Sequence, residues 1–135
     1  MRGGGVDMST INVLIIDDDE ITLTLLENIV KELVTGNIFV FSNSIKAKAF
    51  LHSREAASVG LVICDWQMPS VTGIHILETL RDNYASCPFL MITVNPTKDL
   101  VNDAIRLSVT DFMVKPFSSD NITKKISLML ANIAK

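Results

Sequence analysis

The sequence predicts an α/β protein, a doubly wound (βα)5 sandwich with a five-stranded parallel sheet and helices on both faces. Three observations support this fold class. The 135 residues, 48% hydrophobic and 20% charged, suit one globular domain. Short apolar segments rich in β-branched or aromatic residues alternate with longer segments whose apolar residues recur at helical spacing. The short segments are apolar throughout, as expected of strands buried on both faces.

The five short apolar segments are expected to form the strands. Because a helix should lie between each strand and the next, the connections should be right-handed crossovers and the strands parallel. In chain order the segments are INVLII (11–16), IFVF (38–41), LVIC (61–64), FLMIT (89–93) and DFMV (111–114).

Helices are expected between the strands and after the last one. In the first of them the apolar stripe begins at Leu25, which leaves Leu23 outside the stripe and exposed. The residues at helical spacing are Leu25, Leu26, Ile29, Val30 and Leu33, then Ile74, Leu77 and Leu80, then Leu100, Ala104 and Leu107, and finally Ile122, Ile126, Met129 and Leu130.

The chain is expected to hold one domain, residues 9–135, preceded by a short leader. Residues 1–8 include three of the six glycines and show no periodicity, which is typical of a flexible tail or an expression remnant. No internal repeat, linker or low-complexity segment follows them.

The composition argues against several classes of protein. A formal charge of −3 with scattered lysines does not favour a sequence-independent grip on nucleic acid or anionic lipid. No apolar run approaches a membrane span, and the N-terminus lacks the apolar region of a signal peptide, so a cytoplasmic location is expected. Cys64 and Cys87 lack metal-site spacing and are too few for a disulfide framework.

Polar residues follow four of the five expected strands. The carboxyl ends of parallel strands meet at one edge of the sheet, where ligands of open α/β sheets bind. The residues expected to meet there are Asp17, Asp18, Asp19 and Glu20 after the first strand, Asp65 after the third, Thr93 at the end of the fourth, and Lys115, Pro116 and Phe117 after the fifth.

Taken singly, each of these residues has an ordinary structural explanation. Aspartates before a helix are good N-caps, and Lys115 could be a solvated charge. Together, however, several carboxylates crowded at one edge repel each other unless a cation compensates them. Carboxylates with waters and phosphate oxygens are the ligands that Mg²⁺ prefers. Lys115 could pair with an aspartate or with a phosphoryl group.

Four segments carry a resemblance to a known family. LIIDDD (14–19), VICDWQMP (62–69), MIT (91–93) and VKPF (114–117), in this order, resemble the receiver domains of response regulators, and the resemblance covers about 11–131. It implies a flavodoxin-like fold and a phospho-accepting role in a two-component phosphorelay. Such a chain takes up and loses a phosphoryl group but is not an enzyme acting on other substrates.

The resemblance also implies roles for individual residues. Asp65 matches the phosphorylated aspartate, and Lys115 the lysine that contacts the phosphoryl group, with a cis peptide bond to the proline that follows. Asp17 and Asp18 match the acidic pair that binds Mg²⁺ together with Asp65 and the backbone carbonyl of Gln67.

The resemblance also implies a conformational switch that responds to phosphorylation. Thr93 matches the hydroxyl that responds to phosphorylation, and Phe112 the aromatic residue that turns with it. Several positions depart from the family pattern: among them, Val94 stands where Ala or Gly is usual and could crowd the site, and Ser108 stands where many members have glycine. The helix that ends before Ser108 is therefore expected to end differently from that of its relatives.

The implied partner is a sensor histidine kinase or a histidine phosphotransfer protein, with an unknown downstream target. A homodimer through the last two helices and the strand between them is possible on the same basis. Two alternatives stay open. One is a receiver-like interaction module that takes no phosphate. The other is a Mg²⁺-dependent aspartyl phosphohydrolase, which the Ile21 that follows Asp17-Asp18-Asp19-Glu20 disfavours.

Overall fold

The chain folds into alternating strands and helices. The computed structural model describes residues 10–134, so the expected leader, residues 1–8, lies outside the described residues. The elements are β1 (Asn12–Ile16), α1 (Glu20–Leu33), β2 (Ile38–Phe41), α2 (Ser44–Phe50), the 3₁₀ helix η2 (Arg54–Ser58), β3 (Val59–Asp65), α3 (Gly73–Asn83), β4 (Phe89–Thr93), α4 (Lys98–Arg106), β5 (Asp111–Val114) and α5 (Ser119–Ile133).

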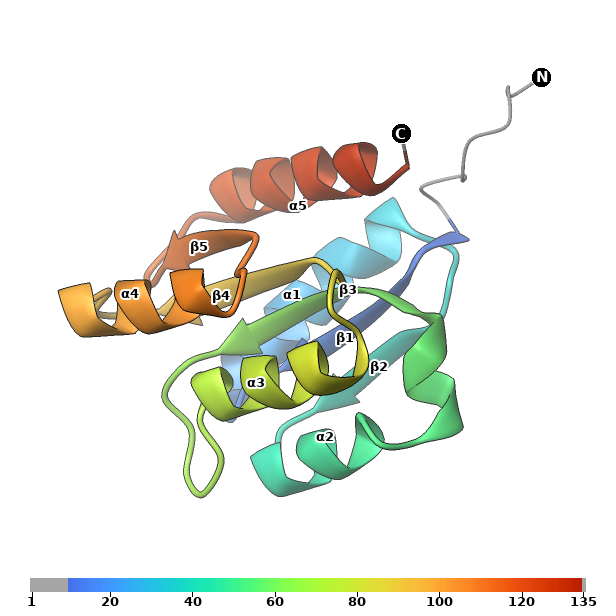
Figure 1. Ribbon diagram of the computed structural model, residues 1–135. Coiled ribbons are helices and arrows are strands. Elements are labelled where there is room, and N and C mark those ends of the chain that lie inside the picture. Colours follow the sequence, from blue (N-terminus) through green and yellow to red (C-terminus); the bar gives the residue numbers. More distant parts are fainter. Residues whose placement is uncertain (1–9, 135) are drawn as a thin grey trace.

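The strands form one parallel sheet in the order β2-β1-β3-β4-β5, with helices on both faces (Figure 1). This confirms the predicted doubly wound (βα)5 architecture. The sequence segments predicted for β2, β4 and β5 have the observed bounds, whereas β3 extends beyond its predicted segment at both ends. Each strand ends at the same edge of the sheet, and each following helix starts there.

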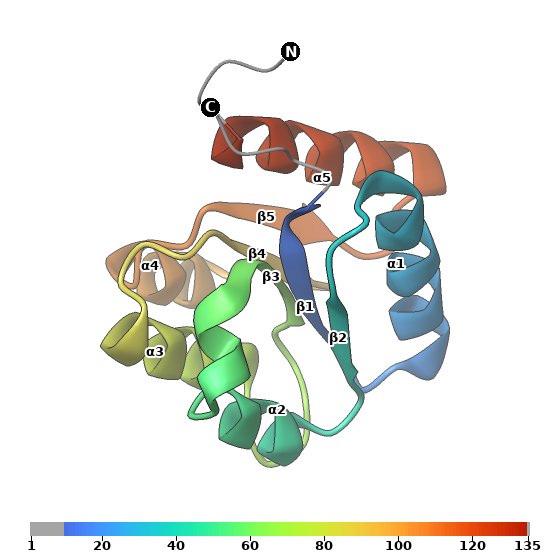
Figure 2. The same cartoon turned by 90° about the vertical axis from the view of Figure 1, so that its right-hand side faces the viewer.

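Alternate residues of the strands serve two separate cores. In β1, Val13 and Ile15 point into the core under α1 and α5, while Leu14 and Ile16 point into the core under α2, α3 and α4. Figure 2 shows α1 and α5 on one side of the sheet and α2, α3 and α4 on the other. Because both faces are covered, the strands need to be apolar throughout.

The expectation for Leu23 was wrong. Its side chain is only 8% exposed and packs in the core with Leu26 and Val30. These three residues are spaced by three and four positions, so the buried stripe of α1 begins at Leu23. Leu25, which was expected to start the stripe, lies at its flank and lines a surface cavity.

The amino edge of the sheet, where the strands begin, is held by the guanidinium of Arg81 from the last turn of α3. It donates to the carbonyl oxygens of Tyr84 and Cys87 before β4 (3.3 and 2.7 Å), and of Leu107 and Ser108 after α4 (both 2.8 Å). These bonds join two neighbouring loops.

The end of α4 differs from what the sequence suggested. Ser108 has a φ of 57°, the left-handed conformation that glycine adopts most easily, and the amide of Val109 donates to the carbonyl of Ala104. A left-handed helix end is therefore kept although serine replaces glycine. Among residues 10–134, no helix is both long and apolar enough to cross a membrane.

Candidate functional site

Three consecutive aspartates follow β1, and the structure gives each a different environment. Asp17 is fully buried, Asp18 is exposed, and Asp19 caps α1. The Asp19 carboxylate accepts hydrogen bonds from the amide of Ile21 (3.1 Å) and the hydroxyl of Thr22 (2.8 Å). Asp19 is thus a helix cap, whereas the carboxylates of Asp17 and Asp18 lie at the edge of the sheet.

Asp65 and Lys115 reach the same place from β3 and from the segment after β5. Asp65 is 6% exposed at the last position of its strand. The Lys115 Nζ lies 2.9 Å from Asp17 Oδ2 and 3.6 Å from Asp65 Oδ1. Lys115 therefore forms ion pairs with both carboxylates, and the one with Asp17 is the closer. The Lys115–Pro116 peptide bond is cis, as the resemblance implied.

The crowding changes the acidities of these groups. Burial, together with the negative charge of Asp17, raises the pKa of Asp65 to about 7. Burial also raises the pKa of Asp17, against the opposing effect of Lys115. For Lys115, burial is the largest single influence and lowers the pKa, but the contacts with Asp17 and Asp65 outweigh it and the net pKa is raised. The carboxylates remain in excess over the single ammonium.

A divalent cation fits this excess of carboxylates. One carboxylate oxygen from each of Asp17, Asp18 and Asp65 lies within 4.8 Å of the others. The buried Asp17 Oδ2 accepts no hydrogen bond from the described residues. Hard oxygen donors of this kind suit Mg²⁺. The backbone carbonyl of Gln67, expected as a further ligand, belongs to the loop directly after Asp65, and its role stays a prediction.

Thr93 ends β4 beside this group of residues. It is 1% exposed, its hydroxyl accepts a hydrogen bond from the amide of Asn95 (3.1 Å), and its carbonyl accepts one from the amide of Lys115 (2.8 Å). A hydroxyl can donate while it accepts, so its proton is available to a ligand at the edge. Phe112 is half-buried on β5 and packs against the core under α3 and α4. The roles of Thr93 and Phe112 in a switch stay a prediction.

The loop from Trp66 to Thr72 joins β3 to α3. The N-cap of α3 is Thr72, so the alternative interpretation of Asp65 as an ordinary helix cap is wrong. The loop closes at its base, where the amide of Gly73 donates to the carbonyl of Trp66 at 2.8 Å. A Cβ atom on Gly73 would lie 2.5 Å from the carbonyl oxygen of Asp65, so this position requires glycine. Sequence reasoning missed this close approach.

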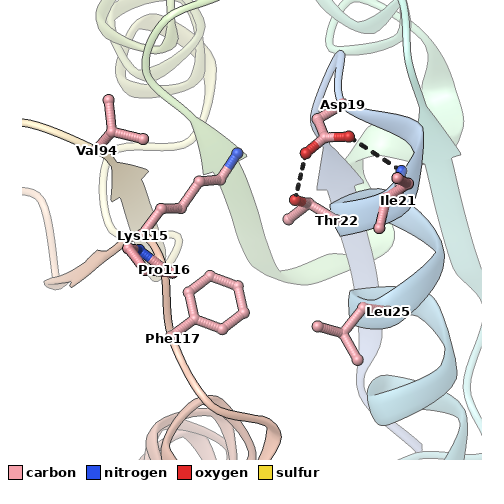
Figure 3. A pocket seen from close by; sticks show the side chains of 8 residues that line it. All are labelled: Asp19, Ile21, Thr22, Leu25, Val94, Lys115, Pro116 and Phe117. Carbon is pink, nitrogen blue, oxygen red and sulfur yellow. Dashed lines mark hydrogen bonds between the residues drawn. The ribbon is translucent and has the colours of Figure 1, made fainter.

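A surface cavity of about 340 Å³ lies beside the carboxylates, between α1 and the segment after β5. Figure 3 shows Lys115 and Val94 on one side of it, with Leu25 of α1 across from Phe117. Val94 is 58% exposed. Val94 lines the cavity but is largely exposed to solvent, and whether it crowds the acceptor site stays a prediction.

The comparisons with known proteins agree with this geometry. Residues 13–127 match the family model of the response regulator receiver domain. The chain is 27% identical over 123 residues to the chemotaxis protein CheY of Pseudomonas aeruginosa, covering 90% of this chain and 97% of CheY. It is 30% identical to the transcriptional regulatory protein FixJ of Bradyrhizobium diazoefficiens, covering 85% of this chain and 54% of FixJ.

Solved structures show the same fold. A receiver domain protein from Methanospirillum hungatei superposes with a TM-score of 0.82 at 18% identity, covering 93% of this chain and 97% of that one. The chemotaxis protein CheY4 of Vibrio cholerae superposes with a TM-score of 0.77 at 20% identity, covering 89% and 98%. With a family model that spans most of its length, this chain belongs to the response regulator receiver domains.

Proposed function

We propose that this chain is a phospho-accepting receiver in a two-component phosphorelay and that Asp65 takes the phosphoryl group with the help of Mg²⁺. The observation that carries the proposal is the arrangement at the carboxyl edge: Asp65 lies 3.6 Å from Lys115 and close to Asp17 and Asp18. This arrangement provides a nucleophile, a cation for the phosphoryl oxygens and ligands for a metal.

In the proposed reaction, a carboxylate oxygen of Asp65 attacks phosphorus. The donor is a phosphohistidine of a sensor kinase or phosphotransfer protein, or a small acyl phosphate. The P–N or P–O bond to the donor breaks and the leaving group keeps the electron pair. Lys115 contacts a phosphoryl oxygen. Asp17, Asp18 and Asp65 would hold a Mg²⁺ ion, which would supply further positive charge for the transferred group. Water later hydrolyses the acyl phosphate, so the mark is transient.

The test is covalent labelling. Incubation with acetyl phosphate and Mg²⁺ should add one phosphoryl mass, measured by intact-protein mass spectrometry. Asp65→Ala and a chelator should each abolish the label, and hydroxylamine should remove it. Asp82→Ala, which removes an exposed carboxylate from α3, is the matched control and should label like the wild type.

A label retained in Asp65→Ala would contradict the assignment of the nucleophile. A wild type that no donor labels would favour the unphosphorylated interaction module, and turnover of a phosphate ester would favour the phosphohydrolase.

The second part of the proposal concerns how the phosphoryl group is read. Its oxygens would draw the hydroxyl of Thr93 inward, which opens room for Phe112 to turn in. Phe112 has no polar tip to keep in solvent, so its inward state costs less than that of a tyrosine. The change would spread over α4, β5 and α5, which expose Ile105, Val114 and Leu128 to a target or to a second copy of the chain.

Backbone amide NMR shifts test this switch. Beryllofluoride, which imitates a phosphoryl group, should shift amides in α4, β5 and α5 of the wild type, and Thr93→Ala should reduce these distal shifts while those around Asp65 remain. A distal response that is unaltered in Thr93→Ala would exclude the Thr93–Phe112 mechanism and leave the acceptor assignment standing.

A further inference from the structure

Ser44, the first residue of α2, contacts the loop that follows Asp65 from another part of the chain. It is 5% exposed although it is a polar residue at a helix start. Its hydroxyl donates to the carbonyl of Pro69 at 2.7 Å and accepts from the amide of Val71 at 3.2 Å. One side chain thus uses both of its hydrogen-bonding capacities on a loop that lies 25 to 27 residues further along the chain.

The two groups that Ser44 binds flank a strained residue. Ser70 has a φ of 71°, and the amide of Val71 also donates to the carbonyl of Pro69 at 2.8 Å, so residues 69–71 form a γ-turn with positive φ. Such turns are rare and strained for residues other than glycine. Strain of this kind persists where the surroundings over-determine it. The Ser44 hydroxyl bridges the two ends of this turn.

Ser44 also joins the tip of the loop, residues 69–71, to α2 through hydrogen bonds. Among residues 10–134, the other hydrogen bonds of loop residues 67–72 join two residues of the loop or reach the first turn of α3. Trp66, at the base of the loop, bonds to Ile92 and Gly73. Gln67, whose carbonyl is the expected metal ligand, lies between that base and the tip. The orientation of its peptide group therefore depends on both attachments.

A small cavity connects this contact to the acidic edge. It has a volume of about 110 Å³, and Ser44 and Ser70 line it together with Asp18. A shift of the loop tip would therefore change the surroundings of Asp18 as well as those of Gln67.

We propose that Ser44 is a positioning residue for the phosphoryl-acceptor site: it holds the β3–α3 loop in the conformation that presents the Gln67 carbonyl to the metal. The proposal rests on the proposed function above. It assigns a role to a residue of α2 that touches neither the metal nor the phosphoryl group. Groups that orient metal ligands from outside the coordination sphere typically change metal affinity by about 10- to 100-fold when they are removed.

The experiment compares Ser44→Ala with Ser53→Ala. Ser53 is the matched control, because its hydroxyl also donates to a backbone carbonyl, that of Phe50 at 2.6 Å, but beyond the last turn of α2. Mg²⁺ affinity is measured through the fluorescence of Trp66, and labelling through the initial rate with acetyl phosphate. Ser44→Ala should lower both by about tenfold, whereas Ser53→Ala should leave both within twofold of the wild type.

A measurement without metal provides an independent readout. The Val71 amide should exchange its hydrogen at least about tenfold faster in Ser44→Ala, because it loses one of its two acceptors, while the Gly73 amide should keep its rate. Ser44→Thr, which retains the hydroxyl, should keep Mg²⁺ affinity close to that of the wild type.

The outcomes separate the two proposals. Equal Mg²⁺ affinities and labelling rates in Ser44→Ala and Ser53→Ala would overturn the role of Ser44 even if Asp65 is labelled normally. A loss of stability in Ser44→Ala without a change in Mg²⁺ affinity would also overturn it. A wild type that binds Mg²⁺ but cannot be labelled would contradict the proposed function, and the comparison of Mg²⁺ affinities would still decide on Ser44.

Discussion

The two edges of the sheet use charge in opposite ways. At the amino edge, Arg81 directs its guanidinium at four backbone carbonyls. At the carboxyl edge, Asp17, Asp18 and Asp65 crowd around the single ammonium of Lys115, and a buried oxygen of Asp17 accepts no hydrogen bond from the described residues. The first edge pairs its cation with backbone carbonyls, whereas the second holds three carboxylates against one cation.

When a substitution removes a charge, this difference predicts the sign of its effect on stability from the edge at which the charge lies. A charge that is fully bonded within the protein should cost stability when removed. A carboxylate that is crowded by its neighbours should increase the stability of the metal-free protein when it is neutralised, at the expense of function. Three substitutions test how the two edges contribute to stability.

The largest effect is expected for Arg81→Met at the amino edge. The substitution keeps much of the side chain's volume but leaves partly buried carbonyls without a donor, so it should lower the free energy of unfolding by about 3 kcal/mol. Urea denaturation measures this loss. Mg²⁺ affinity should stay within twofold of the wild type, because the site lies at the other edge.

Arg106→Met is the control for Arg81→Met. Arg106 is exposed on α4 and pairs with the carboxylate of Asp103 three residues earlier, and such a surface pair contributes at most about 0.5 kcal/mol. Equal losses from the two substitutions would show that the bonds of Arg81 contribute no more than a surface charge.

An intermediate effect of opposite sign is expected for Asp65→Asn at the carboxyl edge. The pKa of Asp65 is raised to about 7 in the folded protein from the ordinary value of 3.8. Between these values the folded state binds more protons than the unfolded state, so the contribution of Asp65 to stability is lost as the pH rises through this window. Above pH 7, the metal-free variant should be more stable than the wild type by about 2 kcal/mol.

Urea denaturation at a series of pH values checks this expectation. The difference between variant and wild type should grow from about pH 4 to pH 7 and then level off. The raised pKa of Asp17 is present in both proteins and largely cancels. Saturating Mg²⁺ should stabilise the wild type and reduce the difference. If the free energies of unfolding of the two proteins changed with pH in parallel, Asp65 would not be crowded, which would contradict the structure.

The smallest effect is expected for Ser108→Gly, again at the amino edge. Glycine adopts the φ of 57° without strain but gains freedom in the unfolded chain, so the net stabilisation should be at most about 1 kcal/mol. Thermal unfolding followed by circular dichroism measures it. A loss of stability would indicate that the serine side chain contributes more than its backbone conformation costs.

The sequence predicted most of the fold and the principal site residues for a clear physical reason. Short segments rich in β-branched or aromatic residues, set between segments with helical spacing, are typical of strands, and this made β2, β4 and β5 recognisable to the residue. In a parallel sheet the residues that follow the strands meet at one edge, and for this reason the sequence alone predicted that Asp17, Asp65 and Lys115 lie together.

What the sequence could not predict depends on distant backbone groups. The contacts of Ser44 with Pro69 and of Gly73 with Asp65 arise only when the loop after β3 has folded against α2 and β3. Arg81 likewise binds carbonyls whose positions follow from the ends of other elements. Leu23 was misplaced because the buried stripe of α1 could be drawn through Leu23 or Leu25 until the neighbouring α5 fixed the orientation of the helix.

The order of the strands places the strands that carry Asp17 and Asp65 inside the sheet and β5 at its border. β1 and β3, which bring Asp17 and Asp65 to the site, each have a neighbour on both sides, whereas β5 borders the sheet and pairs with β4 alone. A border strand with its adjoining helices can open locally without unpairing the interior strands. New partner specificities could therefore evolve through substitutions on the outer faces of α4, β5 and α5, while β1 and β3 keep Asp17 and Asp65 in place at the proposed acceptor site.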